Sequence, residues 1–380
     1  MISKDHKKHS DIARPSLGNF GRNEFSFIGT TCGNVKALAD KIMAASSATR
    51  KCAYIDASHQ SGDVDTPHCF AEYTDRISYK EIRYSNTPGN FQFRGLLNEA
   101  DLILVNGNHY QAQSQVIIID KVKENSLLKR VAQITNPVLI LMAENTEAVF
   151  DFVKEAIPHW QQLPIYGLNE TEKIVDFFEA LAQQSIPKVN GLVLAGGKST
   201  RMGYDKSAIA WHGKEQKYYM ADMLGALCRQ VYISCRNDQV AQTDAAYQTI
   251  ADSFTGLGPY GAILSAFREQ PDAAWLVTAC DLPLLDTPTL QYLLQNRDAS
   301  AIATTFESPH DGLPEPLITV WEPKAYPILL SFLAQGYSCP RKVLRNNDVH
   351  IITPEKKENL LNVNTTEELE EANLLLKANV

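Results

Sequence analysis

Residues 191–206 read GLVLAGGKSTRMGYDK, and this stretch is the most informative part of the chain. It begins with the apolar run Leu192 to Ala195, which is typical of a strand buried on both faces. Gly196 and Gly197 follow, and glycine lets the backbone turn close to a ligand. Three cationic residues then lie within nine positions: Lys198, Arg201 and Lys206. Because exposed backbone N–H groups and cations together hold polyanions, the stretch predicts a site for a nucleoside triphosphate.

The stretch fits neither the P-loop motif GxxxxGK[ST] nor the dinucleotide motif GxGxxG. It resembles the signature LAGGxSxRMGxDK of molybdenum cofactor guanylyltransferases, the MobA family of nucleotidyltransferases. The matching positions are Leu194, Ala195, Gly196, Gly197, Ser199, Arg201, Met202, Gly203, Asp205 and Lys206. The resemblance covers residues 190–375 and implies a fold like that of nucleotide-diphospho-sugar transferases. A glycine turn with solvated charges is the alternative.

Composition narrows the class of protein. The 380 residues suggest two or three domains, and a net charge of −8 argues against general nucleic-acid binding. No apolar stretch approaches the roughly 20 residues that span a bilayer, which argues against a membrane protein. Residues 1–23 are polar and are expected to form a flexible tail rather than a secretory signal. The seven cysteines form no CxxC pair, which favours reduced thiols and a cytoplasmic location.

The chain alternates apolar strand candidates with amphipathic segments in two halves. We expect two Rossmann-like three-layer α/β domains, over residues 24–183 and 191–380, with a linker over 184–190. The expected strands are 25–28, 53–55, 102–105, 116–119 and 138–142, and then 191–195, 231–234, 275–279, 301–305, 317–320 and 350–352. Helices are expected over 35–45 and 170–182, and from near residues 207, 261, 287, 324 and 365. Open, mostly parallel sheets bind ligands at the carboxyl ends of their strands, where the 196–206 loop would lie.

The catalytic residues follow from the resemblance. Asp281 comes directly after an apolar run, and the matching aspartate of the family holds the metal, which implies Mg²⁺ here. An aspartate that begins a turn before Pro283 is the alternative. We assign Arg201 and Lys206 to the charge that grows on the α-phosphate and on pyrophosphate.

A second segment, residues 252–261, resembles the guanosine-contacting pattern D-x(5)-G-P-x-x-G of the family. A plain Gly/Pro loop is the alternative. The nucleotide-binding residues implied by both segments are Leu194, Ala195, Gly196, Gly197, Lys198, Ser199, Asp252, Gly258 and Gly261. Gly197 favours GTP over CTP, because guanylyl-transferring members carry LAGG and cytidylyl-transferring relatives carry LAAG.

Residues 362–369 resemble the family motif NVNTPEEL, in which Asn362 and Asn364 would line the catalytic pocket. Glu315 and Arg341 fall where the family meets its acceptor, although a solvated surface explains Arg341 about as well. Glu215-Gln216 stands where the family has Pro-Leu, a departure that we expect to affect only a turn.

The first half, residues 24–183, resembles MobB, the GTP-binding adapter of the same pathway, but with a degenerate P-loop. Asn34, Val35 and Lys36 stand where Gly, Lys and Ser/Thr should follow Gly29, and Asn106 replaces an acidic residue. We expect a docking or dimerisation module that no longer hydrolyses GTP. An unrelated α/β domain is the alternative.

The resemblances together predict an enzyme that transfers GMP from GTP to molybdopterin and releases pyrophosphate. A cytidylyltransferase or sugar-phosphate nucleotidyltransferase of the same fold is one alternative, and a non-catalytic nucleotide-binding adapter is another. The implied partners are GTP, molybdopterin and, through the N-terminal domain, molybdoenzymes or other cofactor-biosynthesis proteins.

Overall fold

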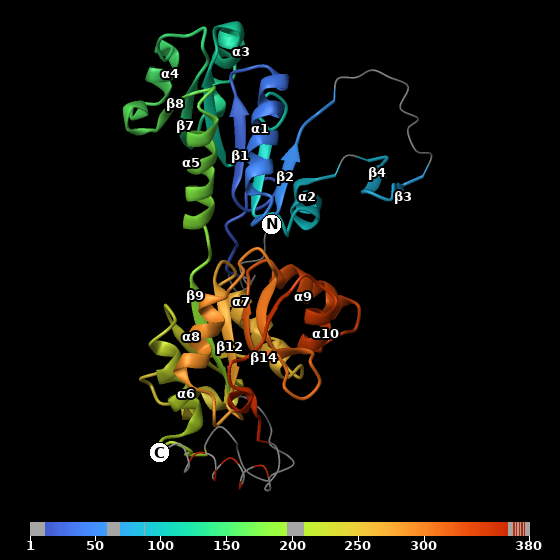
Figure 1. Cartoon of the computed structure of the whole chain (residues 1–380), viewed down its shortest axis with the longest axis vertical. Coiled ribbons are helices and arrows are strands. Elements are labelled where there is room, and N and C mark those ends of the chain that lie inside the picture. Colours follow the sequence, from blue (N-terminus) through green and yellow to red (C-terminus); the bar gives the residue numbers. More distant parts are fainter. Residues whose placement is uncertain are drawn as a thin grey trace, which may run out of the picture. The chain divides into compact units, whose positions relative to one another are not determined.

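A computed structural model describes residues 12–58, 69–86, 88–195 and 209–363, together with residues 368, 370, 372, 374 and 376. The chain divides into two compact units, Ser16–Ile186 and a second unit that begins at Pro187. Figure 1 shows the chain and labels many of the helices and strands of both units. None of the helices in these residues is long and apolar enough to cross a membrane.

A six-stranded parallel sheet forms the centre of the first unit, in the order β2-β5-β1-β6-β7-β8. Its strands are β1 (Glu24–Ile28), β2 (Cys52–Ile55), β5 (Leu102–Asn106), β6 (Ser114–Ile119), β7 (Pro137–Met142) and β8 (Ile165–Gly167). The helices are α1 (Cys32–Ser46), α2 (Asn90–Leu96), α3 (Glu124–Leu128), α4 (Asp151–Ala156) and α5 (Thr171–Gln184). Short 3-10 helices span Lys121–Lys123, Val131–Gln133 and Trp160–Gln162.

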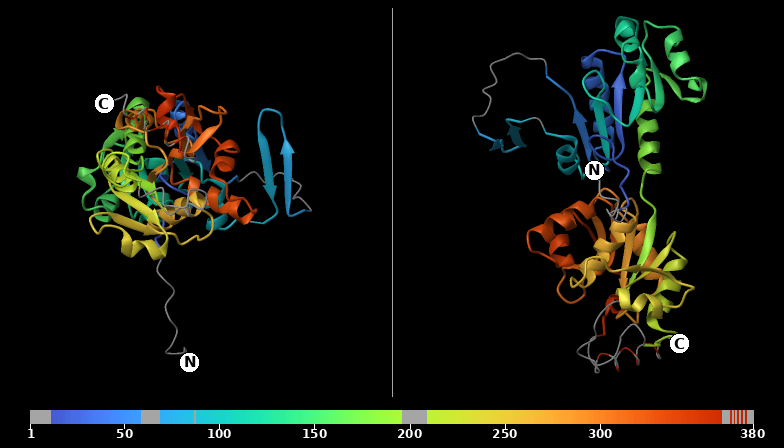
Figure 2. Two further views of the ribbon diagram at one scale, coloured as in Figure 1. Left: turned by 90° about the horizontal axis from the view of Figure 1, so that it is seen from below. Right: turned by 180° about the vertical axis from the view of Figure 1, so that it is seen from behind.

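Side-chain alternation on β6 divides the core of this unit into two layers. Val116 and Ile118 pack with α1 and α5, whereas Ile117 and Ile119 pack with α3 and α4 on the other face. Both sets are buried because successive strand residues point to opposite faces of a sheet that helices cover on both sides. The expected three-layer α/β fold is confirmed, and Figure 2 shows it from two further directions.

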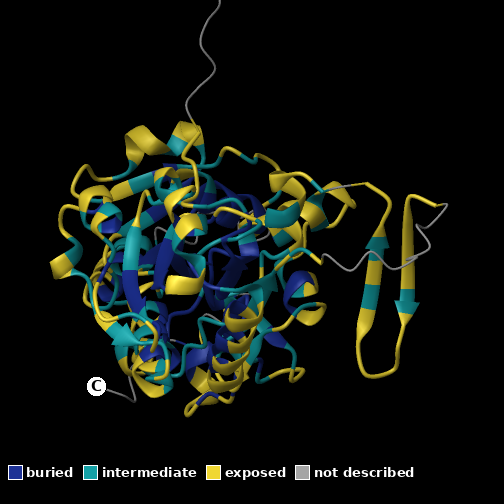
Figure 3. Cartoon of the chain, turned by 90° about the horizontal axis from the view of Figure 1, so that it is seen from above, coloured by how far each residue is buried: buried dark blue, intermediate teal, exposed yellow. Residues whose placement is uncertain are grey.

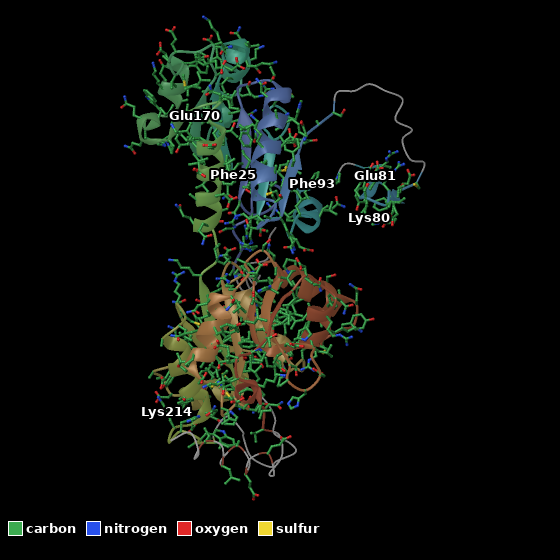
Figure 4. The ribbon with its side chains drawn as sticks, viewed as in Figure 1. Phe25, Lys80, Glu81, Phe93, Glu170 and Lys214 are labelled. Atoms are coloured by element: carbon green, nitrogen blue, oxygen red, sulfur yellow. The ribbon has the colours of Figure 1, made fainter. Side chains whose placement is uncertain are left out.

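A separate hairpin consists of β3 (Ala71–Asp75) and β4 (Lys80–Tyr84), which pair only with each other. Its residues are mostly exposed in Figure 3, and Figure 4 labels Lys80 and Glu81 on it. Sequence analysis did not predict this hairpin, because its strands contain no buried residue and therefore show no apolar pattern. The short strand β8 was missed as well.

The end of the expected tail is in fact packed against the first unit. Phe20 is only 4% exposed and contacts the rings of Phe93 and Tyr110 edge-on. The carboxylate of Glu24 accepts hydrogen bonds from the backbone N–H groups of Asn19, Phe20, Gly21 and Gln113, at 2.7 to 3.3 Å. The prediction of a flexible tail through residue 23 is therefore wrong for residues 19–23, because a buried carboxylate gathers their backbone donors.

The second unit contains a seven-stranded sheet in the order β11-β10-β9-β12-β14-β13-β15. Its strands are β9 (Val189–Leu194), β10 (Val231–Cys235), β11 (Gln248–Ala251), β12 (Ala274–Ala279), β13 (Ala303–Glu307), β14 (Pro314–Trp321) and β15 (His350–Ile352). Strand β14 is antiparallel to both neighbours, and all other pairs are parallel. The expected open and mostly parallel sheet is confirmed, while β11 was not predicted.

Helices cover both faces of this sheet as well. They are α6 (Gln216–Gly225), α7 (Pro259–Glu269), α8 (Thr287–Gln295), α9 (Ala325–Ala334) and α10 (Pro340–Arg345), with 3-10 helices at Asn237–Gln242 and Lys357–Leu360. α6 and α8 pack on one face, and α7, α9 and α10 pack on the other.

Two expected boundaries differ from the structure. The linker over 184–190 is shorter, because α5 continues through Gln184 and β9 already begins at Val189. The helix starts expected near residues 207 and 365 lie outside the described residues.

We predict that Glu24→Gln destabilises the first unit. The variant retains one oxygen acceptor but loses the charge that four backbone donors share, and Glu24 is only 1% exposed. Hydrogen bonds to a charged group contribute about 1.5–3 kcal/mol each, so the free energy of unfolding should fall by roughly 2 kcal/mol. Urea denaturation followed by circular dichroism measures this change. An unfolding transition of the first unit at the same urea concentration as in the wild type would contradict the prediction.

Candidate nucleotide and metal site

The carboxyl ends of four neighbouring parallel strands, β11, β10, β9 and β12, form one edge of the second sheet. Leu194 at the end of β9 pairs with Ser234 of β10 and with Ala279 of β12. The residues that follow these strands therefore lie at the same edge, where open α/β sheets bind ligands. The structure brings Ala195, Asp252 and Asp281 to this edge. Seven predicted site residues lie outside the described residues: Gly196, Gly197, Lys198, Ser199, Arg201, Lys206 and Asn364.

Asp252 follows β11 and is anchored to the neighbouring strand. Its backbone N–H donates to the carbonyl of Cys235 at 3.0 Å, and its carboxylate accepts from the hydroxyl of Ser234 at 2.8 Å. Burial raises the pKa of Asp252, although Ser234 and Arg236 oppose the shift. Asp252 also lines a groove of about 670 Å³ that runs along β11 to the end of α7. This volume is within the range of small-molecule sites.

The two predicted glycines at the start of α7 have different structural roles. Gly258 has a φ of +57° and a ψ of −137°, a conformation that only glycine adopts readily. Gly261 is buried, and a Cβ atom there would lie 2.1 Å from the carbonyl oxygen of Phe254. Gly261 is therefore required for packing of the 252–261 loop on α7, whatever contact it makes with a ligand.

Asp281 lies two residues beyond the end of β12, and its charge acts on the carboxylate of Glu315. Burial raises the pKa of Glu315 on β14, and the charges of Asp281 and Asp311 raise it further, while Arg341 opposes the shift. Arg341 on α10 donates to Asp311 at 3.0 Å and to Glu315 at 3.2 Å. The structure thus joins the predicted acceptor residues Glu315 and Arg341 into one ion-pair network beside Asp281.

The predicted asparagine segment also reaches Asp281. Val363, which follows the exposed Asn362, donates its backbone N–H to the carbonyl of Asp281 at 2.8 Å. Asn364 lies outside the described residues. Residues that are distant in sequence from Asp281 are therefore brought to its loop by tertiary contacts.

Two further side chains hold this loop, and sequence analysis assigned neither to the site. His212 Nε2 lies 3.0 Å from the carbonyl oxygen of Pro283, and Gln216 Nε2 donates to the carbonyl of Leu282 at 3.4 Å. The only signal was the unusual Glu215-Gln216 pair, for which we expected a local effect on a turn. That interpretation was incomplete, because Gln216 is fully buried and reaches a loop 66 residues away.

The site suits a hard divalent cation that retains phosphate and water ligands. Asp281 and Glu315 are neighbouring carboxylates, and Mg²⁺ typically binds through one or two carboxylates together with substrate phosphates. Among the described residues, no group of three or more His, Cys, Asp and Glu side chains could enclose a metal. The donor set thus agrees with a metal shared between protein and nucleotide.

The fold and this edge define a nucleotidyltransferase-type α/β domain. Residues 191–351 match the MobA-like NTP transferase domain, so the second unit is a nucleotidyltransferase domain. The divalent-metal dependence that is general among such enzymes agrees with the carboxylates described above.

Relatives extend this result. A molybdenum cofactor biosynthesis bifunctional protein of Synechocystis is 32% identical over 202 residues, which are 53% of this chain and 58% of that protein. A "probable molybdenum cofactor guanylyltransferase" of Natronomonas pharaonis is 31% identical over 172 residues, covering 43% of this chain and 78% of that protein. The chain belongs to the molybdenum cofactor guanylyltransferase family. The crystal structure of molybdopterin-guanine dinucleotide biosynthesis protein A from Archaeoglobus fulgidus is 22% identical, with a TM-score of 0.44, and covers 50% of this chain and 99% of that one.

The corresponding edge of the first unit carries a network that is satisfied internally. Thr30 donates to Asp120 at 2.7 Å, and Asn34 donates to Thr30 at 3.0 Å, at the position of the degenerate P-loop. Lys36 forms an ion pair with Asp40 one turn further along α1. Asn106 is fully buried and donates to Asp56 at 2.9 Å. Carboxylates and amides thus occupy an edge where a triphosphate would require cations.

We predict that protonation of Asp252 weakens GTP binding at low pH, which appears as an acid limb in the plot of affinity against pH. Only the ionised carboxylate accepts hydrogen bonds at both oxygens, and burial raises its pKa, so affinity for GTP should fall as pH decreases, beginning above the ordinary aspartate range. Asp252→Asn should bind GTP about ten-fold more weakly near neutral pH, because a charged acceptor is lost, and should lack the acid limb. Calorimetric titration with GTP from about pH 5 to 8 measures both effects, and an identical pH profile in the variant would contradict the assignment.

Proposed function

We propose that the second unit transfers GMP from GTP to molybdopterin and releases pyrophosphate. The observation that carries this proposal is the position of Asp281, at the edge where β9 leads into the glycine-rich loop and beside Glu315. The family to which the chain belongs supports the choice of a pterin acceptor. The seven cysteines form no CxxC pair, which supports a cytoplasmic location.

GTP rather than CTP is proposed as the donor because of Gly197. The residue follows Gly196 in the LAGG sequence that guanylyl-transferring members carry. A methyl group at this position would occupy space beside the edge of the base. The nucleotide would otherwise be held by the backbone of residues 194–199 and by the 252–261 segment.

The proposed reaction is an in-line displacement. An oxygen of the acceptor phosphate forms a bond to the α-phosphorus of GTP as the bond to the bridging oxygen breaks, and pyrophosphate leaves with that oxygen. No protein nucleophile is needed, because positioning and charge neutralisation account for this type of chemistry. Arg201 and Lys206 neutralise charge on the α-phosphate and on pyrophosphate.

The metal and acceptor sites complete the proposal. Asp281 would hold Mg²⁺, which supplies further neutralisation of phosphate charge when bound. Arg341 is an acceptor contact whose charge Asp311 and Glu315 partly balance. Asn362 and Asn364 contribute amide groups to the acceptor side.

We predict that Asp281→Ala abolishes transfer while leaving the fold intact. The side chain is partly exposed, and the backbone carbonyl that Val363 contacts is retained in the variant. Metal-dependent formation of the dinucleotide and release of pyrophosphate should fall by about 100-fold or more, since metal and phosphate charge lose their carboxylate.

The assay supplies each NTP with Mg²⁺ and molybdopterin and scores both products. Circular dichroism checks that the variant is folded. Full activity of a folded Asp281→Ala would refute the metal role. A wild-type chain that forms a dinucleotide faster with CTP would refute the proposed base choice.

We further propose that the first unit is a MobB-like module that binds no Mg·GTP and docks molybdoenzymes or other cofactor-biosynthesis proteins. The pairing of Lys36 with Asp40 and of Thr30 with Asp120 supports the loss of a phosphate site. The change of an acidic residue to Asn106 removes a second ligand for Mg²⁺.

The stoichiometry of GTP binding tests this second proposal. Calorimetric titration of the full chain with GTP and Mg²⁺ should give one site per chain, because only the second unit offers a phosphate loop with cations. A second stoichiometric site would overturn the assignment of the first unit.

A further inference from the structure

Residues 280–286 form the loop that links β12 to α8, and this loop carries Asp281. The position of the Asp281 carboxylate therefore depends on the conformation of the loop backbone. Leu282 and Leu285 anchor the loop in the core, with 4% and 2% exposure, whereas Asp281 is only partly buried. These two buried side chains fix the loop against the hydrophobic core. The orientation of the loop backbone is further restrained by hydrogen bonds to its carbonyl oxygens.

Three consecutive carbonyl oxygens of this loop accept hydrogen bonds from two distant parts of the chain. Val363 N–H contacts the carbonyl of Asp281 at 2.8 Å. The other two contacts come from side chains of one short segment, Gln216 Nε2 to Leu282 O at 3.4 Å and His212 Nε2 to Pro283 O at 3.0 Å. This segment begins six residues after Lys206, the last residue of the glycine-rich motif.

Packing alone does not explain why the buried residue 216 is a glutamine. It is fully buried at the first turn of α6, and its Oε1 atom has no partner among the described residues. Burial of an incompletely paired amide costs free energy, and an apolar side chain of similar length would fill the same space. The donor that Gln216 presents to Leu282 O is therefore its distinctive contribution.

His212 is oriented by stacking rather than by a second polar partner in the described residues. Its ring lies over that of Tyr219, with centroids 3.9 Å apart and planes at 15°. A carbonyl oxygen only accepts, so Nε2 of His212 must carry the proton in this contact. The stack directs that N–H towards Pro283 O.

We infer that His212 and Gln216 are positioning residues that hold the 281–283 backbone so that the carboxylate of Asp281 meets the metal at one fixed place. This inference rests on the proposed metal role of Asp281. Residues that orient a metal ligand from behind typically change metal affinity or activity by about 10- to 100-fold when they are replaced. A purely structural role would lower stability without a selective effect on the metal.

The test uses two variants of the full chain and a matched control. His212→Phe keeps the ring stack on Tyr219 and removes the donor, and Gln216→Met keeps the length of the side chain and removes its donor. The control is Gln115→Met, because Gln115 is also buried and donates to a backbone carbonyl, Ala112 O at 2.8 Å, but lies in the first unit.

Mn²⁺ serves as the probe, and its binding in the presence of GTP is followed by electron paramagnetic resonance, with thermal unfolding measured in parallel. Each second-unit variant should bind Mn²⁺ about ten-fold more weakly than the wild type, whereas Gln115→Met should lose only thermal stability. An unchanged Mn²⁺ affinity in either folded variant, with a lowered melting temperature, would overturn the inference.

This titration needs no acceptor, so it separates the inference from the proposed function. A wild-type chain that binds Mn²⁺ with GTP but forms no molybdopterin dinucleotide would refute the proposed function alone. In that case the variants still decide the role of His212 and Gln216. Absence of Mn²⁺ binding to the wild type with GTP, CTP and ATP alike would overturn the positioning role together with the metal role of Asp281.

Discussion

The hydrogen bonds to the carbonyls of Asp281, Leu282 and Pro283 are the constraint on which the candidate site depends. A carboxylate at the end of a strand can bind a metal together with the substrate phosphates only if its backbone is held in a fixed position. Here the donors come from the segment after the phosphate loop and from residue 363, near the C-terminus. This loop therefore connects two parts of the chain that are far apart in sequence, and Met220 and Leu360 of these parts also share one hydrophobic core with Leu282 of the loop.

The two units share an architecture and differ at the ends of their strands. Both place helices on the two faces of a mostly parallel sheet, with polar residues at the carboxyl edge. In the first unit, Thr30, Asn34 and Asp120 satisfy one another, and Lys36 is engaged with Asp40. In the second unit, Asp281 and Glu315 share an edge where a metal would relieve their repulsion. The same three-layer architecture can thus support a structural network or a ligand site, although the order and direction of the strands differ between the two sheets.

Sequence patterns predicted the central strands well because these strands are buried on both faces. β5, β6, β9 and β12 read as apolar runs, and the structure confirms them. The missed strands lack that signal, since β11 is short and lies at a sheet edge, and no residue of β3 or β4 is buried. Motif spacing predicted Asp252 and Asp281 as site residues, but it gave no sign of Gln216 or His212, whose contacts span 66 and 71 residues.

The sequence by itself determined the α/β class, the division into two halves and the family of the second half. Buried strands appear as apolar runs, and the 191–206 motif is continuous in sequence, so both can be recognised without the structure. Only the tertiary structure decided that Gly261 is a packing residue, that Glu24 gathers the end of the N-terminal segment, and that Arg341 joins Glu315. It also decided what holds Asp281 in place. These facts depend on hydrogen bonds and close approaches between distant segments, and such contacts form only when the sheet brings those segments together.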